Sequence, residues 1–448
     1  MQFIALGGGH QIGASAYHLT LDGRRFLIDT GLDPEKAQRK ADFEALLRIA
    51  RLPPASQLDA ILITHAHLDH VGGLLDLLAI APSVPVYMHP HTARLAKALF
   101  QRMPGIQDGF GRGKGWQRFL TVMEQLHDLT YDQPLIPIPS QPDLSVTLLD
   151  AGHIPGSASV LLQGREGSAL VTGDFNDRST LFLQGTRHNP AYQGLKVDVM
   201  VAEGTYAGLP VTEGPGMLDP AALPSLVQKV SARGGTVVIP AFALGRAQEV
   251  LGWLGQHPEQ GPPPLPIWYD PSCAAHVALY RQLFPTFLQD PALRARLVLD
   301  AEGLPPKSPP LDKPLVIVVS SGMVQPGSGA MKFVTWAAQD TRNAIVLTGH
   351  QVEGTLGAKL AQAAEGQRKV EGFYVGDGYY RLKAEVHACR MSAHAGHDGL
   401  MDLIERVAPK KLILVHRHND LAAQSRFVQG LQPLPVLLPQ NGERLELR

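Results

Sequence analysis

The chain contains the stretch His65-Ala66-His67-Leu68-Asp69-His70, which offers two sets of metal ligands within six residues. An apolar run precedes it at 61–63 and another follows at 71–75, a pattern that predicts a buried strand, a loop and a helix start. On an extended segment His65 and His67 point the same way, whereas Asp69 and His70 follow the turn and point elsewhere. Imidazole and carboxylate groups together suit zinc or manganese, and two separated clusters suit two ions. The alternative is a polar loop that holds histidines by chance.

Other apolar runs also end in residues that bind metals or move protons. The runs at 146–149, 169–172, 197–201 and 411–415 lead to Asp150 and His153, Asp174, Glu203 and His416. Short apolar runs bounded by Gly and Pro predict buried strands, so side chains just past their ends gather along one edge. A lone strand-end Asp or His is more often a cap or a satisfied core group. Together these residues offer ligands for two zinc sites with Asp174 between them: His65, His67, Asp69, His70, His153, Asp174 and His416.

Composition limits the classes of protein to which the chain can belong. The 448 residues are 44% hydrophobic, which is enough for a large core and favours two. A formal net charge of −1 gives no global basic field, so any polyanion must meet a local patch or the metals. Cys273 and Cys389 are too few for a disulfide framework, which fits a reducing cytosol. With no signal-like start and no apolar stretch of about 20 residues, we expect a cytoplasmic protein that does not enter membranes.

The order of these motifs resembles that of the metallo-β-lactamase-fold hydrolases, over almost the whole chain. Asp29 matches the first acidic motif, the 65–70 stretch the second, His153 the third and Asp174 the fourth. Three later segments resemble the extra motifs of the β-CASP nucleases, namely Glu203-Gly204-Thr205-Tyr206, Ser392-Ala393-His394 and Leu414-Val415-His416. That family includes the RNase J enzymes, the pre-mRNA 3′-end endonuclease and prokaryotic relatives. Two further segments look similar to it, Ser320-Ser321-Gly322-Met323 and the stretch 351–357.

The resemblance implies an α/β fold, an αββα metallo-β-lactamase sandwich with an inserted β-CASP domain. We expect the first domain at 1–207, the insert at 208–378 and the return to the first domain at 379–448. Within the insert, apolar runs at 236–240, 267–269, 315–319 and 344–347 alternate with helix-like stretches. Such a pattern predicts a mainly parallel sheet covered on both faces.

The family resemblance also implies the roles of the metal ligands. His65, His67 and His153 would hold one ion, Asp69, His70 and His416 the second, and Asp174 would bridge the two. Asp29 would orient a ligand histidine, as such sites usually require. Two divalent ions, zinc or alternatively manganese, lower the pKa of a shared water from 15.7 toward about 7 and neutralise phosphodiester oxygens. Asp69 and Asp174 would therefore serve catalysis as well as metal binding.

Proton transfer to the leaving 3′-oxygen falls to His394, because imidazole titrates near pH 6.5. Glu203 would orient His394 and support its protonated form. The alternative for Glu203 is a structural acid at a strand end.

Two segments and one arginine are weaker candidates for contact with the substrate. Ser320, Ser321 and Gly322 offer hydroxyl and N–H groups to a phosphate, although an ordinary strand-to-helix turn explains them nearly as well. Arg246 would clamp a phosphate or form a structural ion pair. The stretch 109–116 mixes basic and aromatic residues, which suits stacking with single strands or a solvated loop.

Three positions depart from the family pattern. Arg417-His418 stands where many relatives carry Gly-Glu, Gly396 where an Asp is common, and His350 where Tyr is frequent. None removes a proposed ligand, so the departures concern the hydrogen bonds around the site.

These features predict a dinuclear zinc ribonuclease that cleaves single-stranded RNA to 5′-phosphate and 3′-hydroxyl ends. A DNA nuclease is the nearest alternative, although His416 favours RNA because DNA-processing relatives tend to lack that histidine. A subunit that has lost catalysis would lack several ligands, and a small-molecule hydrolase would leave the insert unexplained. Endonuclease or 5′-exonuclease action, the physiological RNA, and a monomer or homodimer all stay open.

Overall fold

The computed structural model describes residues 1–33, 42–103, 113–210, 217–255, 265–301, 303–349, 351, 354–366, 369–389 and 391–447. Packing divides the chain into two compact units, unit 1 (Met1–Val211 and His394–Arg448) and unit 2 (Thr212–Ala393). Within the described ranges, no helix is both long and apolar enough to cross a bilayer. The limits of the inserted β-CASP domain that we expect from the sequence, at 207/208 and 378/379, remain a prediction. The packing division falls later, at 393/394, because strand β18 (Glu385–Cys389) pairs with a strand of unit 2.

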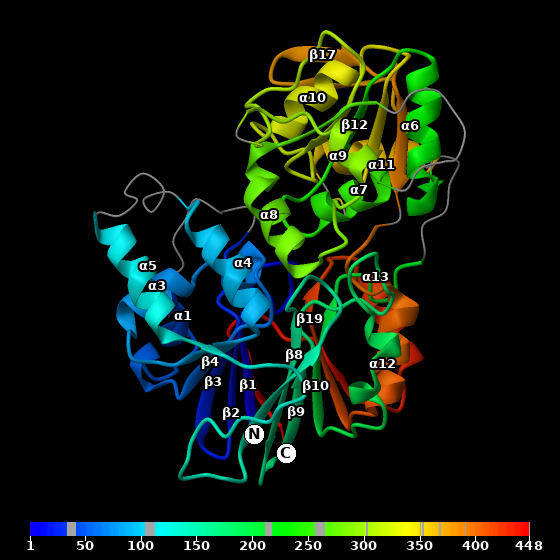
Figure 1. Cartoon of the computed structure of the whole chain (residues 1–448). Helices are drawn as coiled ribbons and strands as arrows, with labels where there is room; N and C mark the ends of the chain where they lie inside the picture. The colour runs from blue at the N-terminus through cyan, green and yellow to red at the C-terminus, as the bar shows by residue number, and fades with distance from the viewer. Residues whose placement is uncertain are drawn as a thin grey trace. The chain divides into compact units, whose positions relative to one another are not determined.

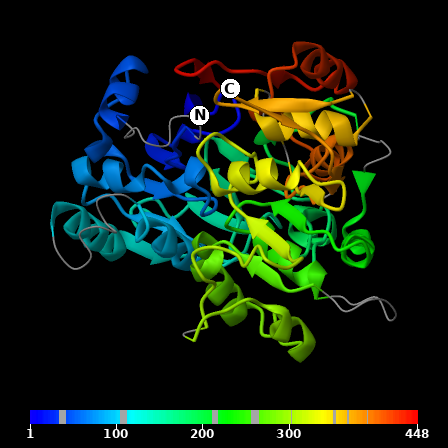
Figure 2. The same ribbon diagram turned by 90° about the horizontal axis from the view of Figure 1, so that it is seen from above.

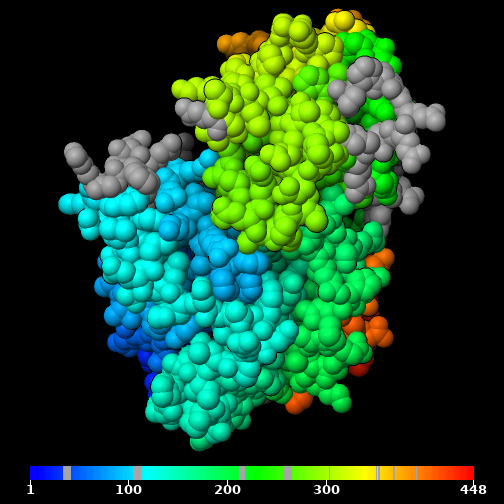
Figure 3. All heavy atoms as spheres, viewed as in Figure 1, coloured from blue at the N-terminus to red at the C-terminus, as the bar shows by residue number. Residues whose placement is uncertain are grey.

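The first sheet of unit 1 has the strand order β21-β1-β2-β3-β4-β5-β6. Its strands are β1 (Gln2–Gly7), β2 (Ala16–Leu21), β3 (Arg24–Ile28), β4 (Ala60–Leu62), β5 (Val86–Met88), β6 (Leu126–Asp128) and β21 (Arg444–Glu446). Because β21 pairs with β1, the two ends of the chain lie side by side (Figure 2). Helices cover the outer face of this sheet (Figure 1), namely α1 (Phe43–Ile49), α3 (Leu74–Ile80), α4 (Pro90–Phe100) and α5 (Gly113–Gln125). Side chains of this part of unit 1 form the blue and cyan surface of Figure 3.

The second sheet of unit 1 has the order β20-β19-β10-β9-β8-β7. Its strands are β7 (Ser145–Asp150), β8 (Ala158–Gly164), β9 (Gly167–Val171), β10 (Val199–Gly204), β19 (Lys411–Arg417) and β20 (Val436–Leu437). Helices α12 (His397–Val407) and α13 (Leu421–Gly430) lie on its outer face (Figure 1). The layers of unit 1 are thus helices, sheet, sheet and helices, which confirms the predicted sandwich.

Strand β10 explains why the strands of this sheet read as unbroken apolar runs. Val199 and Val201 face the core between the two sheets, whereas Met200 and Ala202 face the core beneath the helices. Successive side chains of a strand point to opposite faces, so a strand buried on both faces needs apolar residues at every position. The polar residues can therefore appear only where the strand ends, and Glu203 is the first of them.

Unit 2 is built on a sheet in the order β11-β18-β15-β12-β14-β13, in which all pairs are parallel. The strands besides β18 are β11 (Met217–Leu218), β12 (Val237–Pro240), β13 (Ile267–Tyr269), β14 (Val316–Val319) and β15 (Ala344–Leu347). The helices are α6 (Leu223–Ala232), α7 (Arg246–Leu254), α8 (Ala274–Leu283), α9 (Pro291–Arg296), α10 (Gly329–Ala337) and α11 (Leu356–Ala364). A hairpin of β16 (Gly372–Val375) and β17 (Gly378–Arg381) is added. The predicted parallel α/β insert is confirmed.

Candidate active site

The site lies where strands of both sheets of unit 1 end. After β4, extended backbone carries His65 and His67, and the short helix α2 (Leu68–Val71) then presents Asp69 and His70. His153 follows β7, and the other ligands predicted from sequence follow β9 or close β19. The structure therefore brings all seven predicted ligands together, from segments that are up to 351 residues apart, since the first is residue 65 and the last is residue 416.

The first cluster consists of His65, His67, His153 and Asp174. Nδ1 of His67 lies 3.1 Å from Nε2 of His65 and 3.1 Å from Nε2 of His153. Asp174 Oδ2 lies 3.6 Å from His65 Nε2 and 3.9 Å from His153 Nε2. Ligands at 2.0–2.1 Å in a tetrahedron are separated by about 3.3 Å, so these spacings fit a single zinc-sized ion.

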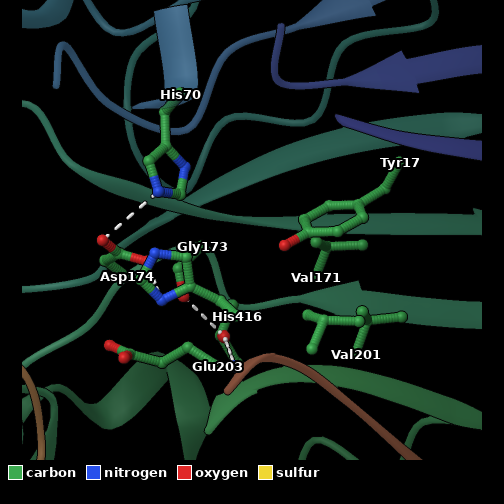
Figure 4. Close-up of a pocket in the computed structure, with 10 residues that line it drawn as sticks. Tyr17, His70, Val171, Gly173, Asp174, Val201, Glu203 and His416 are labelled. Atoms are coloured by element: carbon green, nitrogen blue, oxygen red, sulfur yellow. Dashed lines mark hydrogen bonds and ion pairs between the residues drawn. The ribbon is translucent and has the colours of Figure 1, made fainter. Parts of the chain in front are cut away.

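The second cluster consists of Asp69, His70 and His416, and Asp174 borders it as well. Asp69 Oδ2 lies 4.0 Å from His70 Nε2 and 3.6 Å from His416 Nε2. Asp174 Oδ2 lies 3.3 Å from His70 Nε2, and its Oδ1 lies 3.7 Å from His416 Nδ1. Figure 4 shows the Asp174 carboxylate between these two rings. One carboxylate thus faces both clusters, which is the arrangement a bridging ligand requires.

Several polar atoms of the clusters are buried without a hydrogen bond. Within the described part of the chain these include Asp174 Oδ1 and His416 Nε2, which both face the second cluster. Buried polar atoms normally find partners, so unpartnered ligand atoms on a carboxylate and a neighbouring histidine fit a bound cation. The donor set therefore fits metal ions.

Three hydrogen bonds set which nitrogen of a ligand histidine carries the proton. His70 Nδ1 donates to Asp29 Oδ2 at 2.7 Å. The Thr64 hydroxyl donates to the same Asp29 oxygen at 2.8 Å, so it is left to accept from His65 Nδ1 at 3.0 Å. With Nδ1 protonated, the Nε2 lone pairs of His65 and His70 face the clusters. Orienting bonds of this kind raise ligand basicity.

Asp29 is completely buried and accepts a further bond from the Thr64 N–H at 2.8 Å. Burial raises the pKa of its carboxyl, while the charge and hydrogen bond of His70 oppose that rise. The structure thus places Asp29 behind His70, at the position expected for an orienting residue.

His394 and Glu203 form a second acid–base pair beside Asp174. His394 Nδ1 lies 2.9 Å from Glu203 Oε2 and 3.1 Å from Oε1. Burial lowers the pKa of His394, but the carboxylates of Glu203 and then Asp174 outweigh it and raise the pKa to about 9. Glu203 binds His394 through Nδ1, so Nε2 is the other ring nitrogen that carries a proton in the imidazolium form. His394, Glu203 and Asp174 are also close enough to hold a cation, so metal content must be part of any test of His394.

Thr205 connects Glu203 to the second cluster. Its hydroxyl donates to Glu203 Oε2 and therefore accepts from His416 Nδ1 at 3.1 Å. The Phe175 N–H also donates to Glu203 Oε1 at 2.8 Å. Thr64 and Thr205 were not predicted from the sequence, although Thr64 directly precedes His65 and Thr205 lies two residues after Glu203. A hydroxyl within two residues of a predicted ligand or acid was the available signal.

Arg417, one of the departures from the family pattern, directly follows His416 and is anchored by three hydrogen bonds. Its buried guanidinium donates to Gly9 O at 3.1 Å, to Gln424 Oε1 at 2.8 Å and to Pro439 O at 3.0 Å. His418 Nε2 donates to Ala207 O at 2.8 Å, and its Nδ1 accepts from the Asp420 N–H. These bonds join the N-terminal loop, helix α13 and the C-terminal loop around β19. His350 lies outside the described residues.

The predicted phosphate ligands all lie in unit 2. The Ser320 N–H and hydroxyl both donate to Asp270 Oδ2, at 3.3 and 2.8 Å, so a carboxylate already occupies these donors. Arg246 is 6% exposed and pairs with Glu249, which is the structural ion pair that the sequence left open. Residues 109–112 of the basic aromatic stretch lie outside the described residues, and the rest begins α5.

Family models match three parts of the chain. The metallo-β-lactamase superfamily matches residues 12–176, the β-CASP domain 247–360, and the RNA specificity domain of Zn-dependent metallo-hydrolases 379–416. The chain is 30% identical to the protein named ribonuclease TTHA0252 of Thermus thermophilus, over 99% of each chain. The chain therefore belongs to the β-CASP group of the metallo-β-lactamase superfamily, and it is a metal-dependent hydrolase.

Other relatives share the whole length of this chain. The protein named transcription termination factor FttA of Pyrococcus abyssi is 30% identical, over 100% of this chain and 72% of its own length. The Integrator complex subunit 11 of Danio rerio is 27% identical, over 98% and 73%. A solved structure of a protein of unknown function from Enterococcus faecalis superposes with a TM-score of 0.58 at 14% identity, over 99% of each chain, and shows the fold alone.

Proposed function

We propose that this protein is a dinuclear zinc-dependent ribonuclease that hydrolyses single-stranded RNA to 5′-phosphate and 3′-hydroxyl ends. The position of Asp174 carries the proposal, because one carboxylate faces both ligand clusters. The relative named as a ribonuclease and the RNA specificity model at residues 379–416 support RNA as the substrate.

Two zinc ions would be held by His65, His67 and His153 on one side and by Asp69, His70 and His416 on the other. When bound, they would supply a hydroxide at neutral pH and neutralise the scissile phosphate. The chain's own residues orient these ligands through Asp29, Thr64 and Thr205.

His394 would donate the proton that the leaving 3′-oxygen needs. Its raised pKa keeps it protonated at neutral pH, and Glu203 fixes the ring through Nδ1. A general acid must lie within hydrogen-bond reach of the atom it protonates, so His394 Nε2 would face the leaving oxygen.

The test uses one single-stranded RNA labelled at its 5′ end or at its 3′ end, with products sized over time. We expect zinc-dependent cleavage that stops on chelation, and transfer of ¹⁸O from labelled water to the new 5′-phosphate. Release of mononucleotides from the 5′ end would identify a 5′-exonuclease, and internal fragments an endonuclease. Products with cyclic 2′,3′-phosphate ends would contradict the proposal, because they form without water attack.

Duplex RNA should resist, and DNA should be a poorer substrate, since RNA is distinguished by its 2′-hydroxyls and splayed bases. A cytoplasmic location is a further part of the proposal, and a size measurement in solution would distinguish a monomer from a homodimer. Manganese is the alternative metal.

A further inference from the structure

Phe242 is an exposed aromatic ring at the carboxyl end of the unit 2 sheet. It lies two residues beyond the end of β12, and 36% of its surface is exposed, whereas the apolar residues of β12 itself are fully buried. Strand β12 lies between β14 and β15 in the sheet. In open parallel α/β sheets, ligands bind outside the carboxyl ends of the strands.

Two glycines flank the ring. A Cβ at Gly322, after β14, would lie 3.1 Å from Phe242 Cδ2 and 3.2 Å from Cε2, so the ring edge rests where a side chain would stand. A Cβ at Gly349, after β15, would meet only Phe242 Cε2, at 3.9 Å. Gln351 Nε2 donates to the carbonyls of Gly322 and Gly349, at 3.0 and 3.1 Å, and ties the two segments together.

The backbone that carries the ring is fixed on both sides. The Ala241 N–H donates to Val319 O at 2.9 Å, and Phe242 O accepts from the Ala247 N–H at 3.0 Å. Gln248 Nε2 donates to Ala243 O, and its Oε1 accepts from the Gly245 N–H. A ring held this way loses little conformational entropy when a ligand stacks on it.

We propose that Phe242 is a stacking platform for one nucleobase of the substrate strand. This inference rests on the proposed function, because that function supplies a single-stranded nucleic acid. Stacking on an aromatic ring is the usual way in which proteins hold unpaired bases, and every base has a face to offer.

The polar neighbours favour a base over a phosphate at this position. Asp270 occupies the donors of Ser320, so its carboxylate would repel a phosphate but not a neutral base. Gly322, which follows Ser321, adds no polar side chain beside the ring, so the contact there is with the ring edge. The segment assigned from sequence to phosphate binding thus becomes one wall of a base site.

The experiment combines substitutions at Phe242 with RNAs that carry one abasic nucleotide, moved stepwise along the strand. Phe242→Leu keeps an apolar side chain but removes the aromatic face, and Phe242→Tyr keeps the face. On intact RNA we expect Phe242→Leu to lower kcat/KM by about 5- to 140-fold and Phe242→Tyr to leave it near wild type. When the missing base is the one that stacks on Phe242, kcat/KM of the wild type should fall by the same factor. The same abasic RNA should not lower kcat/KM of Phe242→Leu any further, because that variant has already lost the contact.

Tyr374→Leu is the matched control, because Tyr374 is a 72% exposed aromatic of the same unit, on β16. It should leave kcat/KM unchanged. If Phe242→Leu lowers kcat/KM by the same factor relative to wild type on every abasic RNA, the stacking proposal is overturned. The Phe242 ring would then have a structural role only.

Binding to metal-free protein, measured by anisotropy of a labelled RNA, separates this inference from the proposed function. If metal-free protein binds RNA through Phe242 but zinc-loaded protein does not cleave it, the ribonuclease is contradicted and the platform stands. If substitution of Phe242 changes neither RNA cleavage nor RNA binding, the platform is contradicted and the ribonuclease stands.

Discussion

The Nδ1 atom of His394 lies 2.9 Å from Glu203 Oε2, and this pair stands beside the carboxylate that faces both metal clusters. Both oxygens of Glu203 also accept hydrogen bonds, Oε1 from the Phe175 N–H and Oε2 from the Thr205 hydroxyl, which fix the carboxylate in place. This geometry supports the proposed role of Glu203, which is to orient His394 and favour its protonated form.

Replacement of His394 by alanine should lower kcat by roughly 10²- to 10⁴-fold, the range for loss of one general acid. Zinc content should stay close to wild type. A substrate with a 3′-bridging phosphorothiolate needs less protonation of its leaving group and should recover much of the loss. If the variant loses zinc, or the sulfur substrate gives no recovery, His394 is a ligand or a structural residue instead.

Glu203→Gln should change the pH dependence of cleavage. In the proposed mechanism the acid form of His394 is the active one, and the Glu203 charge contributes most to raising its pKa to about 9. Loss of that charge lowers the pKa, so the alkaline limb of kcat/KM should move to lower pH. Because the pKa of His394 is higher in the folded protein than its value near 6.5 in the unfolded chain, protonation of His394 stabilises the fold. This stabilisation is complete below pH 6.5 and is lost as the pH rises through about 9. An alkaline limb at the wild-type position would show that Glu203 does not charge His394.

Asp174→Ala should abolish hydrolysis, because neither cluster would keep the shared oxygen ligand. Wild-type protein should contain close to two zinc or manganese equivalents per chain by elemental analysis. Asp59→Ala is a suitable control, since Asp59 pairs with Arg24 on β3 outside the clusters. One equivalent or fewer in a fully active wild-type enzyme would rule out the dinuclear account.

Arg417→Met should weaken the metal cluster that contains His416. The substitution leaves Gly9 O, Gln424 Oε1 and Pro439 O without their buried donor, at a cost of about 1–3 kcal/mol for each group left unsatisfied. We expect a lower free energy of unfolding and zinc content that falls from two equivalents toward one. Arg426→Met on the exposed face of α13 should change stability by no more than about 0.5 kcal/mol. Wild-type zinc content in Arg417→Met would show that Arg417 does not position His416.

The fold and the set of proposed ligands could be predicted from the sequence, whereas most of the hydrogen bonds around those ligands could not. His65, Asp174 and His416 were identifiable because unbroken apolar strands allow polar residues only at their ends. Arg417 was visible only as a departure from the family pattern, since its partners come from residues 9, 424 and 439. Arg246 was ambiguous for a different reason: its partner Glu249 is only three residues away, but whether the arginine is buried in that ion pair or exposed to a substrate is not visible in the sequence.

Phe242 was missed entirely. In sequence it follows a buried strand and precedes a helix, as a core phenylalanine would. Its exposure depends on Gly322 and Gly349, which lie about 80 and 107 residues further along the chain and offer no side chains to cover it. Such an arrangement follows from the order of strands in the sheet, which no local pattern reveals.

The most direct test of the whole account is kcat/KM on single-stranded RNA and single-stranded DNA of one sequence, at one salt concentration with zinc present. We predict faster hydrolysis of RNA, leaving 5′-phosphate ends, with Asp174→Ala inactive on both. Because the net charge is −1, binding depends on few phosphate contacts, so the preference for RNA should persist as salt is raised. Equal or faster hydrolysis of DNA would contradict the account and make a DNA nuclease the better description of this protein.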